Sequence, residues 1–129
     1  MRTIKQKVVV SAAPADIYDA LTNARKITAF TESPATGAAR VGGTFTVWDG
    51  YITGVHRELV KGKKIVQDWR TTEWPEGAAD SRLELTFTRV KGGTEIRMVH
   101  SNVPAEQADS YRQGWFDYYW KPLQAYFTE

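Results

Sequence analysis

Residues 104–127, PAEQADSYRQGWFDYYWKPLQAYF, decide the fold that we predict for this chain. Apolar side chains recur there three and four residues apart, which is the spacing of one face of an α-helix. Two such rows lie side by side: Phe116, Trp120, Leu123 and Phe127 form the first, and Tyr111, Trp115, Tyr119 and Tyr126 form the second. The pattern predicts a helix of about twenty residues whose wide apolar face covers a large apolar surface. Pro122 is expected to kink this helix, because proline removes a backbone hydrogen bond.

The residues before this helix predict the sheet on which it packs. Apolar and polar side chains alternate along six segments, and short turns such as Asp49-Gly50 and Gly92-Gly93 join consecutive segments. The predicted strands cover residues 3–10, the segment from Gly42 to the Asp49-Gly50 turn, and residues 51–60, 63–72, 82–89 and 95–103. Two short helices are predicted after the first strand, one beginning at Pro14 and one over residues 25–30.

These elements predict a single α+β domain over residues 1–129. The economical packing is a helix-grip fold, in which a curved antiparallel sheet of about six strands wraps around the long C-terminal helix. The sequence contains no internal repeat and no linker-like segment that would divide the chain.

The composition excludes several classes of function. The 129 residues contain no cysteine, so a disulfide scaffold, thiol catalysis and cysteine-bound zinc are excluded. The net charge of +2 is too small to indicate nucleic-acid binding. No apolar run approaches the ~20 residues of a membrane-spanning helix, and residues 1–10 lack the continuous apolar stretch of a signal peptide. We therefore expect a cytoplasmic protein with neither a nucleic acid nor a membrane as its partner.

The basic residues are densest at Lys61, Lys63 and Lys64, where Gly62 predicts a hairpin turn. Two interpretations remain open. The favoured one is a charged turn that keeps the strand edges soluble, and the other is an electrostatic contact for an acidic partner.

The sequence contains no motif typical of catalysis, of a metal site or of a cofactor site. A G-x-S-x-G segment, a glycine-rich phosphate loop and an H-E-x-x-H segment are all absent. His56 and His100 are both predicted to point into the interior, where they form either two structural histidines or a catalytic pair. The structural interpretation is favoured, because buried polar groups usually have structural partners. We predict no catalytic residue, no metal and no cofactor.

A cavity between the sheet and the helix is the candidate ligand site. Gln67 and Asn102 would orient a polar head group there, and Gly54 and Gly114 would leave room beside aromatic walls. The same aromatic residues would alternatively fill the core. The candidates, all predicted to face inward, are Phe45, Gly54, His56, Ile65, Gln67, Trp69, Leu83, Leu85, Phe87, Met98, His100, Asn102, Trp115 and Tyr119.

Short segments in a fixed order, from about Ala29 to Phe127, carry a resemblance to a known family. They are Ala29-Phe30-Thr31, Ser33-Pro34-Ala35, Gly42-Gly43-Thr44-Phe45, Asp49-Gly50 with Gly54, Ile65-Val66, Trp69-Arg70, Trp74-Pro75-Glu76-Gly77, Leu85-Thr86-Phe87, Pro104-Ala105, and Arg112-Gln113-Gly114-Trp115 with Tyr118-Tyr119. The chain resembles the C-terminal domain of the activator of heat-shock protein 90 ATPase family, within the START and birch-pollen-allergen-like (SRPBCC) superfamily. The WPEG and RQGW segments are the most specific of these matches.

The resemblance implies a helix-grip fold, no catalytic machinery and a heat-shock protein 90 chaperone as partner. In the eukaryotic activators an N-terminal domain precedes this one and anchors the chaperone, and we expect no counterpart of that domain in these 129 residues. Stand-alone members of the superfamily hold a small apolar ligand between sheet and helix, and some carry out cyclase or hydrolase chemistry there. We therefore expect a non-enzymatic interaction module, with the binding or sensing of a small hydrophobic ligand as the alternative and an enzyme as the third hypothesis.

Overall fold

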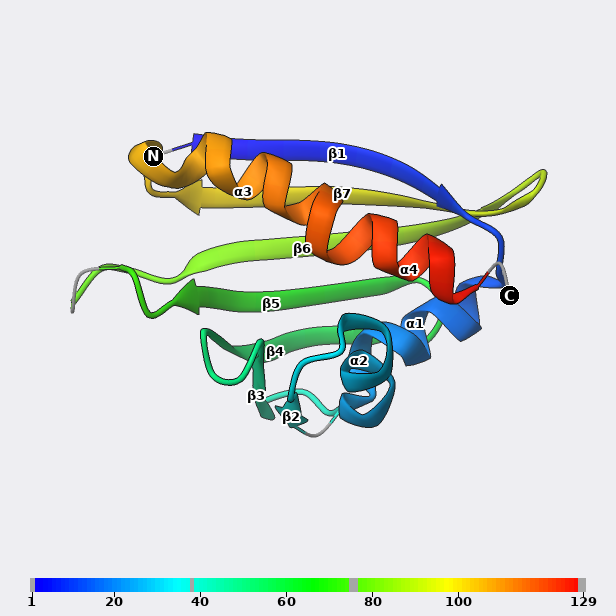
Figure 1. Cartoon of the computed structure of the whole chain (residues 1–129), viewed down its shortest axis with the longest axis horizontal. Helices are drawn as coiled ribbons and strands as arrows, with labels where there is room; N and C mark the ends of the chain where they lie inside the picture. Colours follow the sequence, from blue (N-terminus) through cyan, green and yellow to red (C-terminus); the bar gives the residue numbers. More distant parts are fainter. Residues whose placement is uncertain (1, 38, 75–76, 128–129) are drawn as a thin grey trace.

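Seven strands form one antiparallel sheet in the computed structural model, and a long helical segment crosses one face of that sheet (Figure 1). The structure describes residues 2–37, 39–74 and 77–127. The strands are β1 (Arg2–Val10), β2 (Thr36–Gly37), β3 (Thr44–Val47), β4 (Ile52–Val60), β5 (Lys64–Thr71), β6 (Ser81–Val90) and β7 (Gly93–Val103). The predicted α+β, helix-grip class is confirmed.

The helices fall into two groups. The short helices α1 (Pro14–Thr22) and α2 (Ala24–Thr31) follow β1, as predicted, and α2 packs against the end of the terminal helix. The terminal segment consists of a 3₁₀ turn (Ala105–Gln107), α3 (Ala108–Trp115), a π-helical turn (Phe116–Trp120) and α4 (Lys121–Tyr126). Within the described residues, no helix has both the length and the apolar character needed to cross a bilayer.

The strand order β1-β7-β6-β5-β4-β3-β2 places the first strand beside the last one. Strands β3 to β7 follow the predicted meander, and β1 pairs with β7 from Arg2↔Val103 to Val10↔Thr94. The seventh strand, beyond the six predicted, is β2, in which Thr36 and Gly37 pair with β3. Two residues are too few to show an alternating pattern, so this strand could not be predicted from the sequence.

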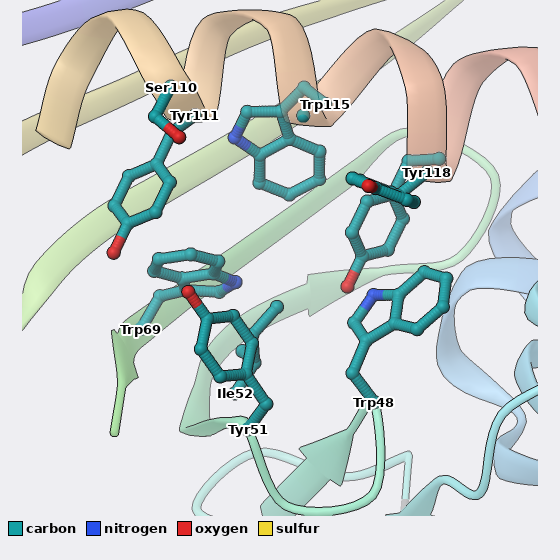
Figure 2. A pocket seen from close by; sticks show the side chains of 10 residues that line it. Trp48, Tyr51, Ile52, Trp69, Ser110, Tyr111, Trp115 and Tyr118 are labelled. Carbon is teal, nitrogen blue, oxygen red and sulfur yellow. The ribbon is translucent and has the colours of Figure 1, made fainter. Parts of the chain in front are cut away.

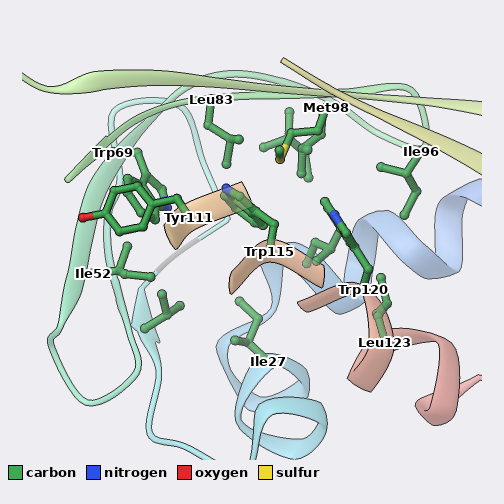
Figure 3. Close-up of a cluster of buried hydrophobic side chains, with 14 of the residues drawn as sticks. Ile27, Ile52, Trp69, Leu83, Ile96, Met98, Tyr111, Trp115, Trp120 and Leu123 are labelled. Atoms are coloured by element: carbon green, nitrogen blue, oxygen red, sulfur yellow. The ribbon is translucent and has the colours of Figure 1, made fainter. Parts of the chain in front are cut away.

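The interior lies between the sheet and the terminal helix, as the alternating patterns indicated. Leu83 of β6 and Trp69 of β5 are buried on the face that the helix covers. Trp115, Trp120 and Leu123 point from the helix toward the sheet side chains (Figure 3). A buried tryptophan removes on the order of 150–250 Å² from water, so these side chains are a major part of what holds helix and sheet together.

The π-helical turn changes which residues of the terminal helix are buried. The Lys121 N–H bonds to the Phe116 carbonyl, five residues back, so the turn holds one residue more than an α-helical turn. Trp115 and Trp120, five residues apart, therefore share one face and stack with ring centroids 5.4 Å apart and an interplanar angle of 19°. The extra residue aligns Trp120 with Trp115 rather than with Phe116. Phe116 is therefore 49% exposed, and the prediction that it belongs to the buried row is wrong. Pro122 comes after Lys121, just beyond this turn, so the wider turn lies in the segment where proline would crowd an α-helix.

The predicted inward orientation of Asn102 is also wrong. Asn102 has a φ of 61°, and the pairing of β1 with β7 shifts register between Arg2 and Ile4. This irregularity places Val103, rather than Asn102, in the core. The Asn102 side chain instead donates a hydrogen bond of 3.1 Å to the Asp80 carbonyl.

Candidate functional site

The space between the sheet and the helix is almost filled by side chains. A cavity of about 40 Å³ remains, close to the share of volume that one molecule has in liquid water. Eight of the predicted candidates line it: Phe45, His56, Gln67, Trp69, Leu83, Leu85, Trp115 and Tyr119. These eight side chains do lie together, and whether they bind a ligand stays a prediction.

The remaining candidates lie elsewhere in the core or at its edge. Ile65, Phe87, Met98 and His100 are buried without lining this cavity. Gly54 leaves no free room, because the Phe45 ring lies over it. A Cβ atom at position 54 would come within 2.5 Å of Phe45 Cζ and 2.2 Å of the Asp68 carbonyl oxygen.

His100 is a neutral histidine that connects three strands and the helix. Its Nε2 lies 2.7 Å from Ser81 Oγ, and the Ser81 hydroxyl donates to the Trp69 carbonyl at 2.7 Å. Its Nδ1 accepts a hydrogen bond of 3.2 Å from the Trp115 indole. Burial lowers the pKa of His100 to about 3, so the ring stays neutral near pH 7. The Ser81 proton points to a backbone carbonyl and both side chains are buried, which supports the structural interpretation of this histidine.

His56 has a separate environment from His100. Its ring packs against the Phe45 ring at a centroid distance of 5.0 Å, and its Nδ1 lies 3.5 Å from the Gln67 amide nitrogen. Burial lowers the pKa of His56. The two histidines thus have different partners, and the contacts of neither one include the other.

A larger and more open pocket lies beside the filled interior. Its volume is about 390 Å³, and it lies between the terminal helix and the turn that joins β3 to β4 (Figure 2). The lining consists of seven aromatic side chains with one isoleucine, one serine and one glycine: Trp48, Tyr51, Ile52, Trp69, Ser110, Tyr111, Gly114, Trp115, Tyr118 and Tyr119. We call this space the side pocket.

The β3–β4 turn gives one wall of the side pocket an unusual backbone. Trp48 and Asp49 both have a φ of 56°, in the left-handed region that bulky residues seldom adopt. The Trp48 ring lies 5.5 Å from the Tyr118 ring and 6.1 Å from the Tyr119 ring, in edge-to-face contacts. The turn thus holds a tryptophan from the sheet against two tyrosines from the helix.

Hydrogen bonds fix the other end of the side pocket. The Tyr111 hydroxyl accepts from the Trp74 indole at 2.7 Å and donates to the Gln107 side chain at 2.5 Å. It also lies 3.1 Å from Thr71 Oγ1. Trp74 begins the predicted turn of residues 74–77, of which Pro75 and Glu76 lie outside the described residues.

The side pocket is uncharged near neutral pH. Burial raises the pKa of Tyr119, although a hydrogen bond with Trp48 opposes that shift. Burial and a hydrogen bond to Glu73 raise the pKa of Tyr51. Both phenols therefore stay protonated. Across the described residues, no three histidine, aspartate or glutamate side chains gather as a metal site would require.

The sequence identified part of this pocket and missed the rest. Trp69, Trp115 and Tyr119 were candidates and Gly114 was expected to leave room beside aromatic walls, whereas the wall formed by residues 48–52 was not predicted. A signal was present, because Trp48 and Tyr51 flank the predicted Asp49-Gly50 turn. These two aromatic residues line a pocket only because the terminal helix passes over the turn, and the sequence does not show that packing.

Comparison with known proteins gives consistent results. The family described as "Activator of Hsp90 ATPase homolog 1-like protein" matches residues 11–128. The activator of 90 kDa heat shock protein ATPase homolog 1 from Homo sapiens is 37% identical over 125 residues, which cover 97% of this chain and 36% of the human protein. The corresponding Dictyostelium discoideum homolog is 35% identical over 116 residues, covering 88% of this chain and 30% of that protein. The chain thus spans about a third of the length of these relatives.

Solved structures show the same fold. An HSP90 activator from Plasmodium falciparum superposes with a TM-score of 0.90 at 24% identity, covering 98% of this chain and 96% of that one. The Aha1 dimer from Colwellia psychrerythraea gives a TM-score of 0.84 at 20% identity, covering 99% of this chain and 98% of that one. At these identities the likeness concerns the fold alone.

Proposed function

Because the chain belongs to the family of Activator of Hsp90 ATPase homolog 1-like proteins, we propose that it is a co-chaperone-like module that binds a 90 kDa heat-shock protein and catalyses no reaction itself. The observation that carries the proposal is the 37% identity to the human activator across 97% of this chain. The proposal places the chain in the cytoplasm with its chaperone partner.

The terminal helix offers a surface suited to a protein partner. Phe116 is 49% exposed and Tyr118 is 58% exposed, although the rest of the helix buries its large aromatic side chains more fully. Aromatic residues are enriched at the energetically important positions of protein interfaces. We therefore expect the chaperone to contact the exposed side of this helix.

The direct test measures the ATPase rate of a purified heat-shock protein 90 from the same organism. We expect the rate to rise when the chain is added, and we expect sedimentation velocity to detect a complex. An ATPase inhibitor specific for the chaperone controls for contaminating activity. An unchanged rate together with the absence of a complex at about 100 μM of each protein would overturn the proposal.

Two matched surface variants locate the contact. Phe116→Ser removes an exposed aromatic side chain from the helix, and Val41→Ser removes an exposed apolar side chain from the loop between β2 and β3. We expect Phe116→Ser to weaken chaperone binding about tenfold, as loss of an interface aromatic does, and Val41→Ser to leave it unchanged. Equal affinities for both variants would show that the contact lies elsewhere on the chain.

The alternative function, binding of a small hydrophobic ligand between sheet and helix, finds less support. Pockets that enclose a small molecule usually measure about 300–1,000 Å³, whereas the interior cavity measures about 40 Å³. A ligand there would have to displace core side chains such as Trp69 or Trp115. Native mass spectrometry of the purified protein tests this alternative, because a carrier would show the added mass of a bound apolar ligand.

A further inference from the structure

The side pocket has the composition of a site for a positively charged organic group. Seven of its ten lining residues are tyrosine or tryptophan, and among those ten there is no aspartate, glutamate, lysine, arginine or histidine. The face of an aromatic ring carries negative electrostatic potential and attracts a cation, most strongly for tryptophan. A compact ammonium ion loses too much hydration in such surroundings, whereas a quaternary ammonium group spreads its charge over methyl groups and is only weakly hydrated. Accordingly, we propose that the side pocket binds a small quaternary ammonium compound.

The size of the pocket fits such a ligand with an attached group. Its volume of about 390 Å³ lies near the lower end of the range for small-molecule sites. Several polar groups of its lining residues already have partners: the Tyr111 hydroxyl bonds to Trp74 and Gln107, the Tyr51 hydroxyl to Glu73, and the Trp115 indole to His100. The pocket therefore suits a ligand with one or two hydrogen-bonding atoms.

The surroundings of the pocket add negative charge without adding a buried anion. The Tyr51 hydroxyl donates a hydrogen bond to the Glu73 carboxylate, which increases the electron density of the Tyr51 ring. Asp49 is exposed in the same turn as Trp48. Both carboxylates stay hydrated and lie next to aromatic walls, so they favour a cation over an anion or a neutral ligand.

Gly114 indicates that the space itself has a role. A glycine within a helix makes that helix less stable than an alanine would. Unlike Gly54, Gly114 is not required by close neighbours, because a Cβ atom there would find only Tyr118 Cδ2, at 3.8 Å. No backbone strain explains this glycine either, since it lies in the regular helix α3. The missing side chain leaves the pocket open on the helix side.

The backbone at Trp48 is a second, independent sign of a binding site. Trp48 and Asp49 are successive non-glycine residues with positive φ, and such strained backbone clusters at ligand clamps. The strained turn aims the Trp48 ring at the helix, where it closes one side of the pocket (Figure 2).

The experiment compares two ligands of the same shape that differ in charge. Choline and its uncharged isostere 3,3-dimethyl-1-butanol are titrated separately while the indole N–H signals of the tryptophans are followed by NMR. We expect saturable shifts of the Trp48 and Trp115 signals with choline, at an affinity at least about tenfold higher than for the isostere. Equal affinities would show an apolar site and overturn the proposal. An absence of shifts at about 100 mM choline would overturn it as well.

Variants connect the binding to the pocket. Trp48→Leu keeps an apolar wall but removes the ring, so choline affinity should fall about tenfold while affinity for the isostere changes little. Gly114→Leu fills the pocket and should abolish binding of both ligands. Phe116→Leu removes an exposed aromatic side chain of the same helix that does not line the pocket, and should leave choline binding unchanged. Unfolding midpoints confirm that each variant folds, and an unchanged choline affinity in folded Trp48→Leu and Gly114→Leu would overturn the proposal. Chaperone stimulation is measured separately, so failure of one proposal leaves the other intact.

Discussion

His100 shows how a titratable side chain can be purely part of the framework. It is fully buried, and its two ring nitrogens contact Ser81 and Trp115, which belong to β6 and α3. Removing one partner from such a buried network costs about 1–3 kcal/mol. The histidine therefore fixes the position of the helix on the sheet through a hydrogen bond rather than through apolar contact alone.

The stability of the protein should depend on pH because of this residue. The pKa of His100 is about 3 in the folded chain and about 6.5 when unfolded, so the unfolded state binds more protons between these values. Stability is therefore complete above about pH 6.5 and falls as the pH decreases toward 3. We expect the free energy of unfolding to decrease by about 2 kcal/mol from pH 7 to pH 5. Urea denaturation followed by circular dichroism at each pH measures this change.

The variant His100→Gln isolates the contribution of the ring. Glutamine offers a donor and an acceptor but does not titrate, so the variant should be less stable at pH 7 and lose less stability on acidification. His56→Gln is measured in parallel, because burial lowers the pKa of His56 as well. That histidine also makes the protein less stable at low pH, and the second variant separates its contribution from that of His100. A decline in His100→Gln as steep as in the original chain would contradict the assignment.

At the residue scale, the sequence predicted positions better than partners. The alternation along β7 placed His100 inside, yet Ser81 is its neighbour only because the register pairs Leu83 with His100. Asn102 was misplaced for a related reason, since a local irregularity at the end of β7 reverses the alternation. Register and bulges depend on the whole sheet, so a single strand does not reveal them.

The terminal helix shows the same limit at the scale of an element. Its length and apolar character were predicted, but the two interleaved aromatic rows are compatible with more than one phase. In the structure the buried face passes from one row to the other at the π-helical turn, which contains one extra residue. The buried aromatic and leucine positions are therefore Tyr111, Trp115, Trp120 and Leu123. A pattern based on spacings of three and four residues does not predict a spacing of five.

Deleting one residue should therefore be tolerated in the π-helical turn and nowhere nearby. Deletion of Tyr118 would bring Trp115 and Trp120 to a spacing of four, which restores the α-helical phase and keeps both rings on the buried face. We expect a loss of about 1 kcal/mol, mainly from the contact with Trp48, and a small decrease in melting temperature.

Deletion of Gln113 is the matched control. It removes an exposed residue from the regular helix α3 and rotates Tyr111 out of phase with Trp115, so it should cost at least about 3 kcal/mol or prevent folding. Melting curves followed by circular dichroism compare the two deletions. Similar losses in both would contradict the role assigned to the π-helical turn.

Across the whole molecule, the N-terminal strand and the C-terminal helix are connected through Gln6. The Gln6 amide nitrogen donates to the Arg112 carbonyl at 2.7 Å, and its oxygen accepts from the Trp120 indole at 2.8 Å. Gln124 reaches β1 as well, donating to the Val9 carbonyl at 2.9 Å. The sequence predicted that Gln6 shares the inward face of β1, but not that it bonds to the helix, because its partners lie more than a hundred residues away.

Removal of this connection should weaken the entire domain. Gln6→Ala leaves the buried Trp120 indole without an acceptor, so we expect the free energy of unfolding to fall by about 1–3 kcal/mol. Lys5→Ala, on the opposite and exposed face of β1, should change it by less than about 0.5 kcal/mol. Urea denaturation measures both, and equal effects would contradict the role given to Gln6.

The charged hairpin turn is exposed at its tip, and both of its interpretations stay open. Lys61 and Lys63 are exposed, and Lys64 lies 3.2 Å from Glu84 and 3.7 Å from Glu58. Exposed pairs of this kind contribute little stability but keep a strand end hydrated.

The pairing of the first strand with the last also sets an order for events on the ribosome. Strand β1 ends at Val10, and its partner β7 begins about 80 residues later at Gly93. At roughly 5–20 residues per second, β1 waits on the order of 4–17 seconds for its partner to be synthesised. During that time Ile4, Val8 and Val10 lack the strand and the helix that cover them in the finished domain. The nascent chain should therefore complete its sheet late, with β1 joining a meander that has already paired.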